Sequence, residues 1–400
     1  MTIKRVKVED LKAGMYVHDL NCSWLEHGFI RQRFALKHAD QIQKIRDHGL
    51  NEIYIDTARG DDVAGAPTQA EIEQGLAQRL KASATGGAAL APARVSQREE
   101  AIAARSILGE AADVVQGLLQ DVRLGKQLDP AKALPLVKAM RSSVLRNPGA
   151  LISLSRIKNA DTYTFQHSVS ICALLVSFAQ ALGMDAATVE EAGLGGLLHD
   201  VGKMKVPNEI LNKPGKLTED EFVVMKSHAD LGEAILRGVP GISSLVVRIA
   251  GEHHEKVSGG GYPRGIAAGE ISQIGRMAAI VDVYDALTSN RVYHKGKEPS
   301  EVLKRLLEWS GSHLDGDLVQ HFIRILGIYP VGSLVRLSGG RLAVVVEQGE
   351  DLLRPTVRVV FDASRKLHLQ PRDLHLAHAT EQIVDYEEPL AWGLDPATYL

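Results

Sequence analysis

Seven histidine and aspartate residues in the middle of the chain have the types and spacing expected of metal ligands. They are His167, His199, Asp200, His228, His253, His254 and Asp282. Imidazoles and carboxylates without thiolates suit iron or manganese and, less selectively, zinc. Two such metals about 3.5–4 Å apart can share a hydroxide that attacks a phosphodiester. Asp200 is the candidate bridging ligand, because its neighbour His199 can bind one metal while Asp200 contacts both.

The competing interpretation is that these side chains are ordinary buried core residues. A single histidine on an apolar helical face is more often a core residue than a ligand. As a set, however, they would leave several buried polar groups unpaired, at a cost of about 1–3 kcal/mol each. Nothing else in this region could pair with so many, so the sequence favours a metal site.

The candidate ligands lie in or beside stretches with helical apolar spacing. From Asp161 to about Gly327 the pattern predicts helices throughout. Asp185 is a suitable N-cap for the helix that runs into His199. Thr218-Glu-Asp-Glu221 is a capping box that opens a helix expected to carry His228. An all-helical bundle with a polar centre is therefore expected.

The stretch that leads into His199 contains Gly193, Gly195 and Gly196. Glycine costs up to roughly 1 kcal/mol at a helical position. The cluster therefore predicts that another backbone approaches this helix closely.

The rest of the chain predicts smaller units around this bundle, so the expected fold class is mainly α. The units are an α+β module at 1–58, a flexible linker at 59–98, connecting helices at 99–150, the helical metal-binding domain at 151–327, a small β-barrel-like module at 328–380 and a tail at 381–400. Within the linker, residues 71–82 have a helical pattern of their own. The helix predicted over 99–124 either packs within the fold or carries a signal or a homodimer contact.

Composition limits the class of protein. The 400 residues carry a formal net charge of −3, which gives no reason to expect binding to duplex nucleic acid or to an anionic membrane. Cys22 and Cys172 are too few for a disulfide framework or a thiolate zinc site. No stretch resembles a signal peptide or a membrane span, and a cytoplasmic location is expected.

Residues 161–327 resemble an HD-GYP domain, a subgroup of the HD phosphohydrolase superfamily. The matching motifs are His167 in Tyr-Thr-Phe-Gln-His, His199-Asp200-Val-Gly-Lys203, His228 in Met-Lys-Ser-His, His253-His254-Glu255, Gly261-Tyr262-Pro263, and Asp282 in Val-Asp-Val-Tyr-Asp-Ala-Leu-Thr-Ser. Their order and spacing agree along the whole domain, which makes the resemblance specific. Residues 1–58 also resemble a domain often found ahead of HD-GYP domains.

This resemblance implies a metal-dependent phosphodiesterase that converts cyclic di-GMP to pGpG, with GMP as an alternative end product. One Fe or Mn ion would use His167, His199, Asp200 and Asp282, and the other would use Asp200, His228, His253 and His254. Some family members hold a third metal through a glutamate one helical turn before the first histidine. Tyr163 occupies that position here, so two metals are expected.

The resemblance also implies substrate contacts. Lys203 and Arg291 would bind phosphate, and Gly261 and Tyr262 would form a loop that stacks on guanine or docks a protein partner, such as a diguanylate cyclase or an adaptor. Two departures affect these contacts. Ser258 replaces an aspartate usual in the family, and His294 stands where the family has a basic residue, so the phosphate contact is altered or shifted to Lys295.

Two other functions stay open at this point. The first is a nucleotide-binding signalling module with little or no activity, which acts through protein partners. Ser258 is the feature that favours it. The second is a hydrolase acting on a different nucleotide, against which the Gly-Tyr-Pro sequence argues.

Overall fold

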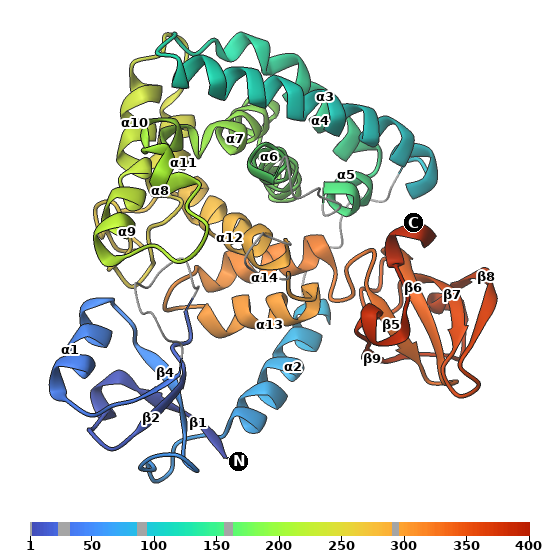
Figure 1. Cartoon of the computed structure of the whole chain (residues 1–400). Helices are drawn as coiled ribbons and strands as arrows, with labels where there is room; N and C mark the ends of the chain where they lie inside the picture. Colours follow the sequence, from blue (N-terminus) through green and yellow to red (C-terminus); the bar gives the residue numbers. More distant parts are fainter. Residues whose placement is uncertain (1, 23–32, 86–93, 156–162, 290–295) are drawn as a thin grey trace.

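The computed structural model describes residues 2–22, 33–85, 94–155, 163–289 and 296–400. A helical body is flanked by two small sheet modules, one from each end of the sequence (Figure 1). The mainly α class predicted from the sequence is confirmed. Among the described residues, none of the helices has the length and hydropathy needed to cross a lipid bilayer.

The N-terminal module, described over 2–22 and 33–58, has an antiparallel sheet with one helix. Its elements are β1 (Ile3–Lys7), η1 (Val8–Asp10), β2 (Tyr16–Asp19), β3 (Phe34–Ala35), α1 (Ala39–Asp47) and β4 (Glu52–Asp56). The strand order is β1-β4-β2-β3. Alternate positions such as Val6, Val17 and Ile53 point into a small separate core, which confirms the expected α+β module.

Helix α2 (Gln69–Thr85) corrects the expectation of a flexible linker over 59–98. The helix packs against α13 (Pro299–Trp309) and α14 (Gly316–Leu326), and buries Leu76 and Leu80 in the main core. The shorter helical pattern seen in the sequence was the correct signal. Its partners lie more than 200 residues away, so local composition could not reveal the packing.

The remaining helices of the helical body (residues 94–327) follow in order. They are α3 (Gln97–Arg123), η2 (Pro130–Lys132), α4 (Leu134–Arg146), α5 (Pro148–Ser155), α6 (Tyr163–Ala181), α7 (Ala186–Leu198), η4 (Val201–Lys205), α8 (Asn208–Leu211), α9 (Glu219–Lys226), α10 (His228–Arg237), α11 (Ser244–Glu252) and α12 (Gln273–Thr288). Both predicted caps are present. Asp185 accepts the backbone N–H groups of Ala187 and Thr188, and Thr218 forms a capping box with Glu221. The helix that Thr218 opens ends at Lys226, however, so His228 lies on the separate helix α10 and not on the one expected.

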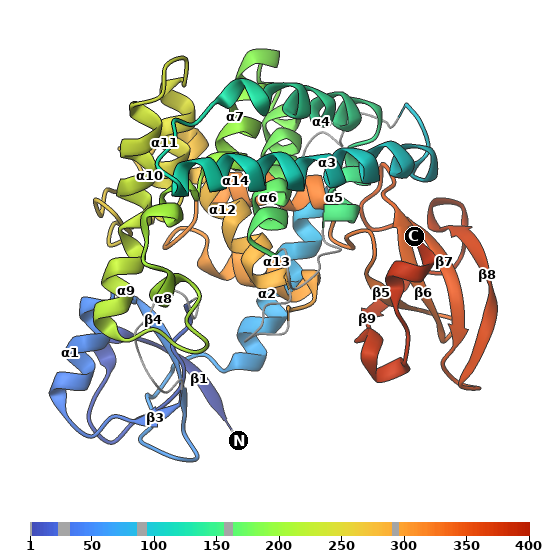
Figure 2. The same cartoon turned by 45° about the horizontal axis from the view of Figure 1, so that its top comes forward.

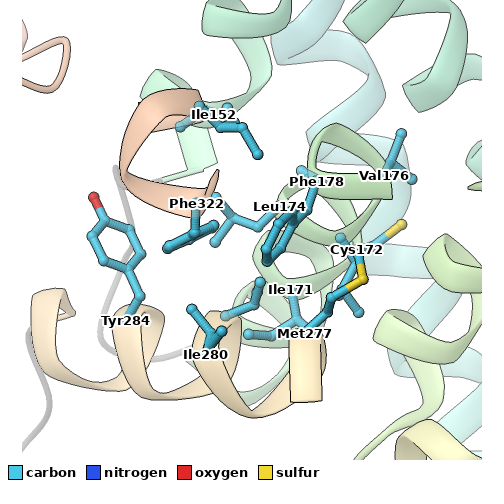
Figure 3. Packing of buried hydrophobic residues seen from close by; sticks show 14 of the residues in the cluster. Ile152, Ile171, Cys172, Leu174, Val176, Phe178, Met277, Ile280, Tyr284 and Phe322 are labelled. Carbon is cyan, nitrogen blue, oxygen red and sulfur yellow. The ribbon is translucent and has the colours of Figure 1, made fainter. Parts of the chain in front are cut away.

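Helix α6 lies at the centre of the helical body, with α3 and α4 on one side and α12 and α14 on the other (Figures 1 and 2). Figure 3 shows its side chains meeting those of α12 and α14. Phe322 lies with its ring centre 5.3 Å from that of Phe178 and 5.3 Å from that of Tyr284. A helix buried on most sides is held rigidly, and α6 carries His167.

The C-terminal module (residues 328–400) is an open antiparallel sheet in the order β8-β7-β6-β5-β9. Its elements are β5 (Leu334–Leu337), β6 (Arg341–Glu347), β7 (Thr356–Asp362), β8 (Leu367–His375), η5 (Leu376–His378), β9 (Ile383–Tyr386), η6 (Pro389–Trp392) and η7 (Pro396–Tyr399). The small β module is confirmed, but its strands close no barrel within the described chain. The residues predicted as a tail supply β9 and bury Leu394 against this sheet.

Candidate metal centre

Six elements bring the seven predicted ligands together. His167 lies within α6, His199 ends α7, and Asp200 begins η4. His228 opens α10, and His253 ends α11 with His254 directly after it; Asp282 lies within α12. Helix ends therefore supply most of the set, because they stop at a shared polar centre.

Asp200 lies in the middle of this group. Its Oδ2 lies 3.3 Å from Nε2 of His199 and 3.7 Å from Nε2 of His167. Its Oδ1 lies 3.4 Å from Nε2 of His228 and 3.8 Å from Nε2 of His253. The two carboxylate oxygens thus face two different pairs of imidazoles.

Asp282 and His254 are the remaining two of the seven predicted ligands, and they also lie at this centre. Oδ1 of Asp282 lies 3.2 Å from Nε2 of His167, and its Oδ2 lies 3.9 Å from Nδ1 of His254. Ligand atoms of His167, His199 and Asp282 lie within 4.8 Å of one another, and so do those of His228, His253 and His254. His199, Asp200 and His253 form a third group of this kind, which joins the two ligand sets expected from the sequence at Asp200, so the division of the ligands between two ions stays a prediction.

The hydrogen-bond acceptor beside Nδ1 of each imidazole determines which ring nitrogen faces the centre. Nδ1 of His199 lies 2.8 Å from the carbonyl oxygen of Gly196, and Nδ1 of His228 lies 2.7 Å from that of Met225. Nδ1 of His253 lies 2.9 Å from the carbonyl oxygen of Ala250. Since a carbonyl only accepts hydrogen bonds, Nδ1 carries the proton in each ring. Nε2 of each ring therefore faces inward, where it offers a lone pair whenever the ring is neutral.

His167 is held differently, because a carboxylate lies behind its ring. Its Nδ1 lies 2.7 Å from Oδ2 of Asp285, three residues after Asp282 on α12. A carboxylate behind a histidine fixes the tautomer and raises the basicity of the inward nitrogen. Sequence reasoning missed Asp285, because the histidine that it supports lies 118 positions away.

The electrostatics favour charged carboxylates, and they favour neutral imidazoles except at His199, where the contact with Asp200 outweighs burial and raises the pKa. Burial lowers the pKa of His228 to about 4 and that of His253 to about 3. Burial opposes ionisation of Asp200, but the charge of Lys203 and the contact with His199 outweigh it and hold the pKa of Asp200 well below its ordinary value. At neutral pH Asp200 and Asp282 are thus charged, and His228 and His253 are neutral and lack a proton on the inward side.

Two buried atoms test whether a cation fits here. Nε2 of His199 and Oδ1 of Asp200 have no hydrogen-bond partner among the described residues. Leaving such groups unpaired is costly, and both point into the centre. Divalent cations would satisfy them, so the side chains present fit a metal.

Close backbone contacts hold the ligand-bearing elements together. A Cβ atom on Gly202 would lie 1.9 Å from the carbonyl oxygen of His228. A Cβ atom on Gly196 would lie 2.9 Å from Cα of Cys172 in α6. The close approach predicted from the glycine cluster is confirmed, and Gly202 adds a second such contact directly after Asp200.

The Gly-Tyr-Pro loop (residues 256–265) borders the centre. The backbone N–H of Tyr262 donates to the carbonyl oxygen of His254 at 3.1 Å, and the ring centres of these two residues lie 4.5 Å apart. Gly261 must be glycine, because a Cβ there would lie 2.5 Å from Cα of Glu255. Buried Glu255 accepts the backbone N–H of Arg264 at 2.8 Å, and this role was not predicted.

The other predicted substrate contacts have different outcomes. Nζ of Lys203 lies 2.5 Å from Oδ2 of Asp200, and its side chain is 25% exposed at the rim. Arg291 and His294 lie outside the described residues. Tyr163 begins α6, but its side chain also lies outside the described part.

This fold and site define the class of protein, and residues 148–318 match the HD domain family. Residues 3–133 match a domain of unknown function. A cyclic di-GMP phosphodiesterase of Pseudomonas aeruginosa, PA4108, is 42% identical over 395 residues, which cover 98% of this chain and 94% of that protein. The chain therefore belongs to the HD-GYP family of HD domain proteins.

Two further comparisons cover less similar proteins. The 3′3′-cGAMP-specific phosphodiesterase 1 of Vibrio cholerae is 36% identical over 176 residues, which cover 44% of this chain and 41% of that protein. A solved structure of Bd1817 from Bdellovibrio bacteriovorus aligns with a TM-score of 0.48 at 18% identity, covering 81% of this chain and 99% of that one.

Proposed function

We propose that the protein hydrolyses cyclic di-GMP to pGpG, using two divalent metal ions held by the seven residues of the centre. The observation that carries this proposal is the position of Asp200, whose two oxygens face separate imidazole pairs. The relative that covers nearly the whole chain is named a cyclic di-GMP phosphodiesterase. Iron and manganese are the proposed metals, because nitrogen and carboxylate ligands without sulfur suit them.

Each side chain of the centre has a defined part in this proposal. His167, His199 and Asp282 would hold one ion, His228, His253 and His254 would hold the other, and Asp200 would contact both. Such a pair of ions supplies an activated water as nucleophile and neutralises charge on the phosphate. The protein itself keeps the imidazoles aligned before substrate arrives.

The residues at the rim would orient the dinucleotide. Lys203 is paired with Asp200 and partly exposed, so its ammonium can turn to a phosphate oxygen without crossing the buried centre. Tyr262 presents an aromatic ring beside His254, where a guanine can stack. Gly261 keeps this loop close to the chain around Glu255. Arg291 and His294 stay predicted phosphate contacts.

A weakly active binding module is the second candidate, and Ser258 is the observation that favours it. The Ser258 hydroxyl donates only to the neighbouring Gly259 carbonyl oxygen, at 3.2 Å, among the described groups. A carboxylate at this exposed position would add charge and a stronger acceptor to the loop. Slow turnover with measurable nucleotide binding is the outcome that this alternative requires.

The test uses full-length protein loaded anaerobically with Fe(II) or with Mn(II). Cyclic di-GMP and 3′3′-cGAMP are offered separately, and products are separated by chromatography. We expect pGpG from cyclic di-GMP, and loss of turnover and metal in Asp200→Ala. Binding of cyclic di-GMP without pGpG under either metal would overturn the proposal in favour of the binding module.

A further inference from the structure

The N-terminal module is joined to the helical body by buried polar contacts at the end of α13. The indole N–H of Trp309 donates to the backbone oxygen of Asn21 at 3.0 Å and to its side-chain oxygen at 3.2 Å. Arg305 donates to the same side-chain oxygen at 2.6 Å. Asn21 is 6% exposed and Trp309 is 3% exposed, so water is largely excluded from this junction.

A second set of contacts fixes the same junction. The Tyr54 hydroxyl in β4 donates to the Glu308 carboxylate, which also lies 3.0 Å from a guanidinium nitrogen of Arg305. The Glu308 side chain is 5% exposed. A buried carboxylate needs its partners, and one of them belongs to the N-terminal module. The module therefore docks in one defined position.

The turn that follows α13 also contacts the Gly-Tyr-Pro loop. The carbonyl oxygen of Trp309 accepts the backbone N–H groups of His313 at 2.9 Å and Leu314 at 3.1 Å, which shapes the turn after the helix. The backbone N–H of Val257 then donates to the carbonyl oxygen of His313 at 3.1 Å, and that of Ser258 to the carbonyl oxygen of Ser312 at 3.0 Å. The start of the loop is thus held in place by hydrogen bonds to this turn.

The module and the loop also lie against each other directly. A Cβ atom on Gly49, just after α1, would lie 3.6 Å from the carbonyl oxygen of Gly260. Gly259 and Gly260 both have positive φ, and glycines bring no side chains to hold the loop. Its shape must therefore come from its surroundings, and the N-terminal module is one of them.

We propose that the N-terminal module positions the Gly-Tyr-Pro loop, with Asn21 and Trp309 as the positioning residues. The Asn21–Trp309 contact holds the turn at 310–314, the turn holds Val257 and Ser258, and the loop presents Tyr262 beside His254. The effect on substrate rests on the proposed function, whereas the effect on loop order does not. The module thereby governs how well the cyclic dinucleotide is held, without touching a metal ligand.

The test compares Trp309→Phe with the wild-type protein. Phenylalanine keeps an aromatic ring but removes the N–H that reaches Asn21. Amide hydrogen exchange is followed in the full chain, and in the variant we expect exchange at Val257 and Ser258 to rise by about three- to tenfold, the weight of one hydrogen bond. KM for cyclic di-GMP should rise by a similar factor, while metal content and kcat stay within about twofold.

A matched control is available in the C-terminal module. The Trp392 indole N–H donates to Glu387 at 2.8 Å, so Trp392→Phe removes the same kind of donor far from the loop. We expect no change at residues 256–265 in that variant. Asn21→Gly is the second test variant, because glycine accepts the φ of 52° found there and removes only the side-chain acceptor.

The two proposals fail in different ways. Faster exchange confined to residues 17–22 and 305–314 in both test variants, with the loop unchanged, would overturn the positioning role. Absence of pGpG in the wild-type protein would overturn the proposed reaction, and the exchange data would still decide the positioning role. A fall in kcat and in metal content at unchanged KM would show that the junction supports the metal centre instead of the loop.

Discussion

At the scale of single residues, the group behind each imidazole determines what the centre can bind. Main-chain carbonyl oxygens contact Nδ1 of His199, His228 and His253, whereas the Asp285 carboxylate contacts Nδ1 of His167. Main-chain acceptors are present whenever the helices form. The acceptor behind His167 depends on one side chain, so it is the one that a substitution can remove selectively.

Asp285→Asn should therefore weaken metal binding. The amide keeps the shape but loses the charge that supports His167, and loss of such a partner typically costs about 10- to 100-fold in metal affinity. Competition with a chelator of known affinity measures the effect. Asp317→Asn, at an exposed position of α14, is the control. Equal affinities in the two variants would contradict the role given to Asp285.

The metal-free protein should lose stability as the pH falls from about 7 to about 5. Burial lowers the pKa of His228 to about 4 and that of His253 to about 3. Between about pH 7 and about pH 5 these two histidines therefore become protonated in the unfolded chain but stay neutral in the folded chain, which favours unfolding. His199 acts in the opposite direction, since Asp200 overcomes its burial and raises its pKa, and its contribution is fully present at low pH. Burial also lowers the pKa of His254, so three groups with a lowered pKa oppose the single group with a raised pKa.

Urea unfolding of chelator-treated protein at both pH values checks this expectation. His253→Gln removes one of the histidines with a lowered pKa, so the urea midpoint of this variant should depend less on pH than that of the wild type. An unchanged pH dependence in this variant would show that other groups are responsible.

The sequence predicted the residues of the centre better than the residues that support them. Type and order along the chain identified the seven candidate ligands, because each lies at a helix end or on a helix whose pattern is local. Asp285 supports a histidine 118 positions away, and Glu255 holds a loop through backbone groups. Neither relationship is visible in the spacing of neighbouring residues.

At the scale of elements, η4 and α10 approach so closely that one glycine becomes essential. Gly202→Ala would place a Cβ 1.9 Å from the carbonyl oxygen of His228. Because both partners are backbone, the elements must separate, and overpacking of this kind costs about 1–3 kcal/mol or more. We expect a lower free energy of unfolding and weaker metal binding in this variant.

Gly109→Ala in α3 is the matched control for that measurement. A Cβ there would meet nothing within 4 Å, and the residue is exposed on a helix. Alanine should therefore stabilise the helix by up to about 1 kcal/mol. Denaturant titration of both variants, with metal content read on the same samples, separates the two outcomes.

Local signals predicted elements well, and distant contacts explain the failures. The caps at Asp185 and Thr218 are made within four residues, so the sequence shows them directly. Helix α2 depends on burial against α13 and α14, and β9 depends on pairing with β5. Their composition resembles that of a linker and a tail until the partners are known.

At the scale of the whole molecule, one core joins the C-terminal module to the helical body. Val335 and Leu376 of the module belong to the same buried cluster as Phe322 of α14. We therefore expect Leu376→Ala, which typically costs about 2–5 kcal/mol at a buried site, to lower the unfolding midpoint of the helices as well. Far-ultraviolet circular dichroism and near-ultraviolet signals should shift together, and separate transitions would contradict a shared core.

The position of strand β8 affects whether copies of this molecule can pair through their sheets. It forms an edge of the C-terminal sheet and is largely exposed. Exposed strand edges invite pairing with another chain, and proline, charge and bulges discourage it. Pro371 lacks an amide hydrogen, Arg372 adds charge, and the register shifts beside them. This edge of the sheet is therefore protected against pairing with a strand of another copy.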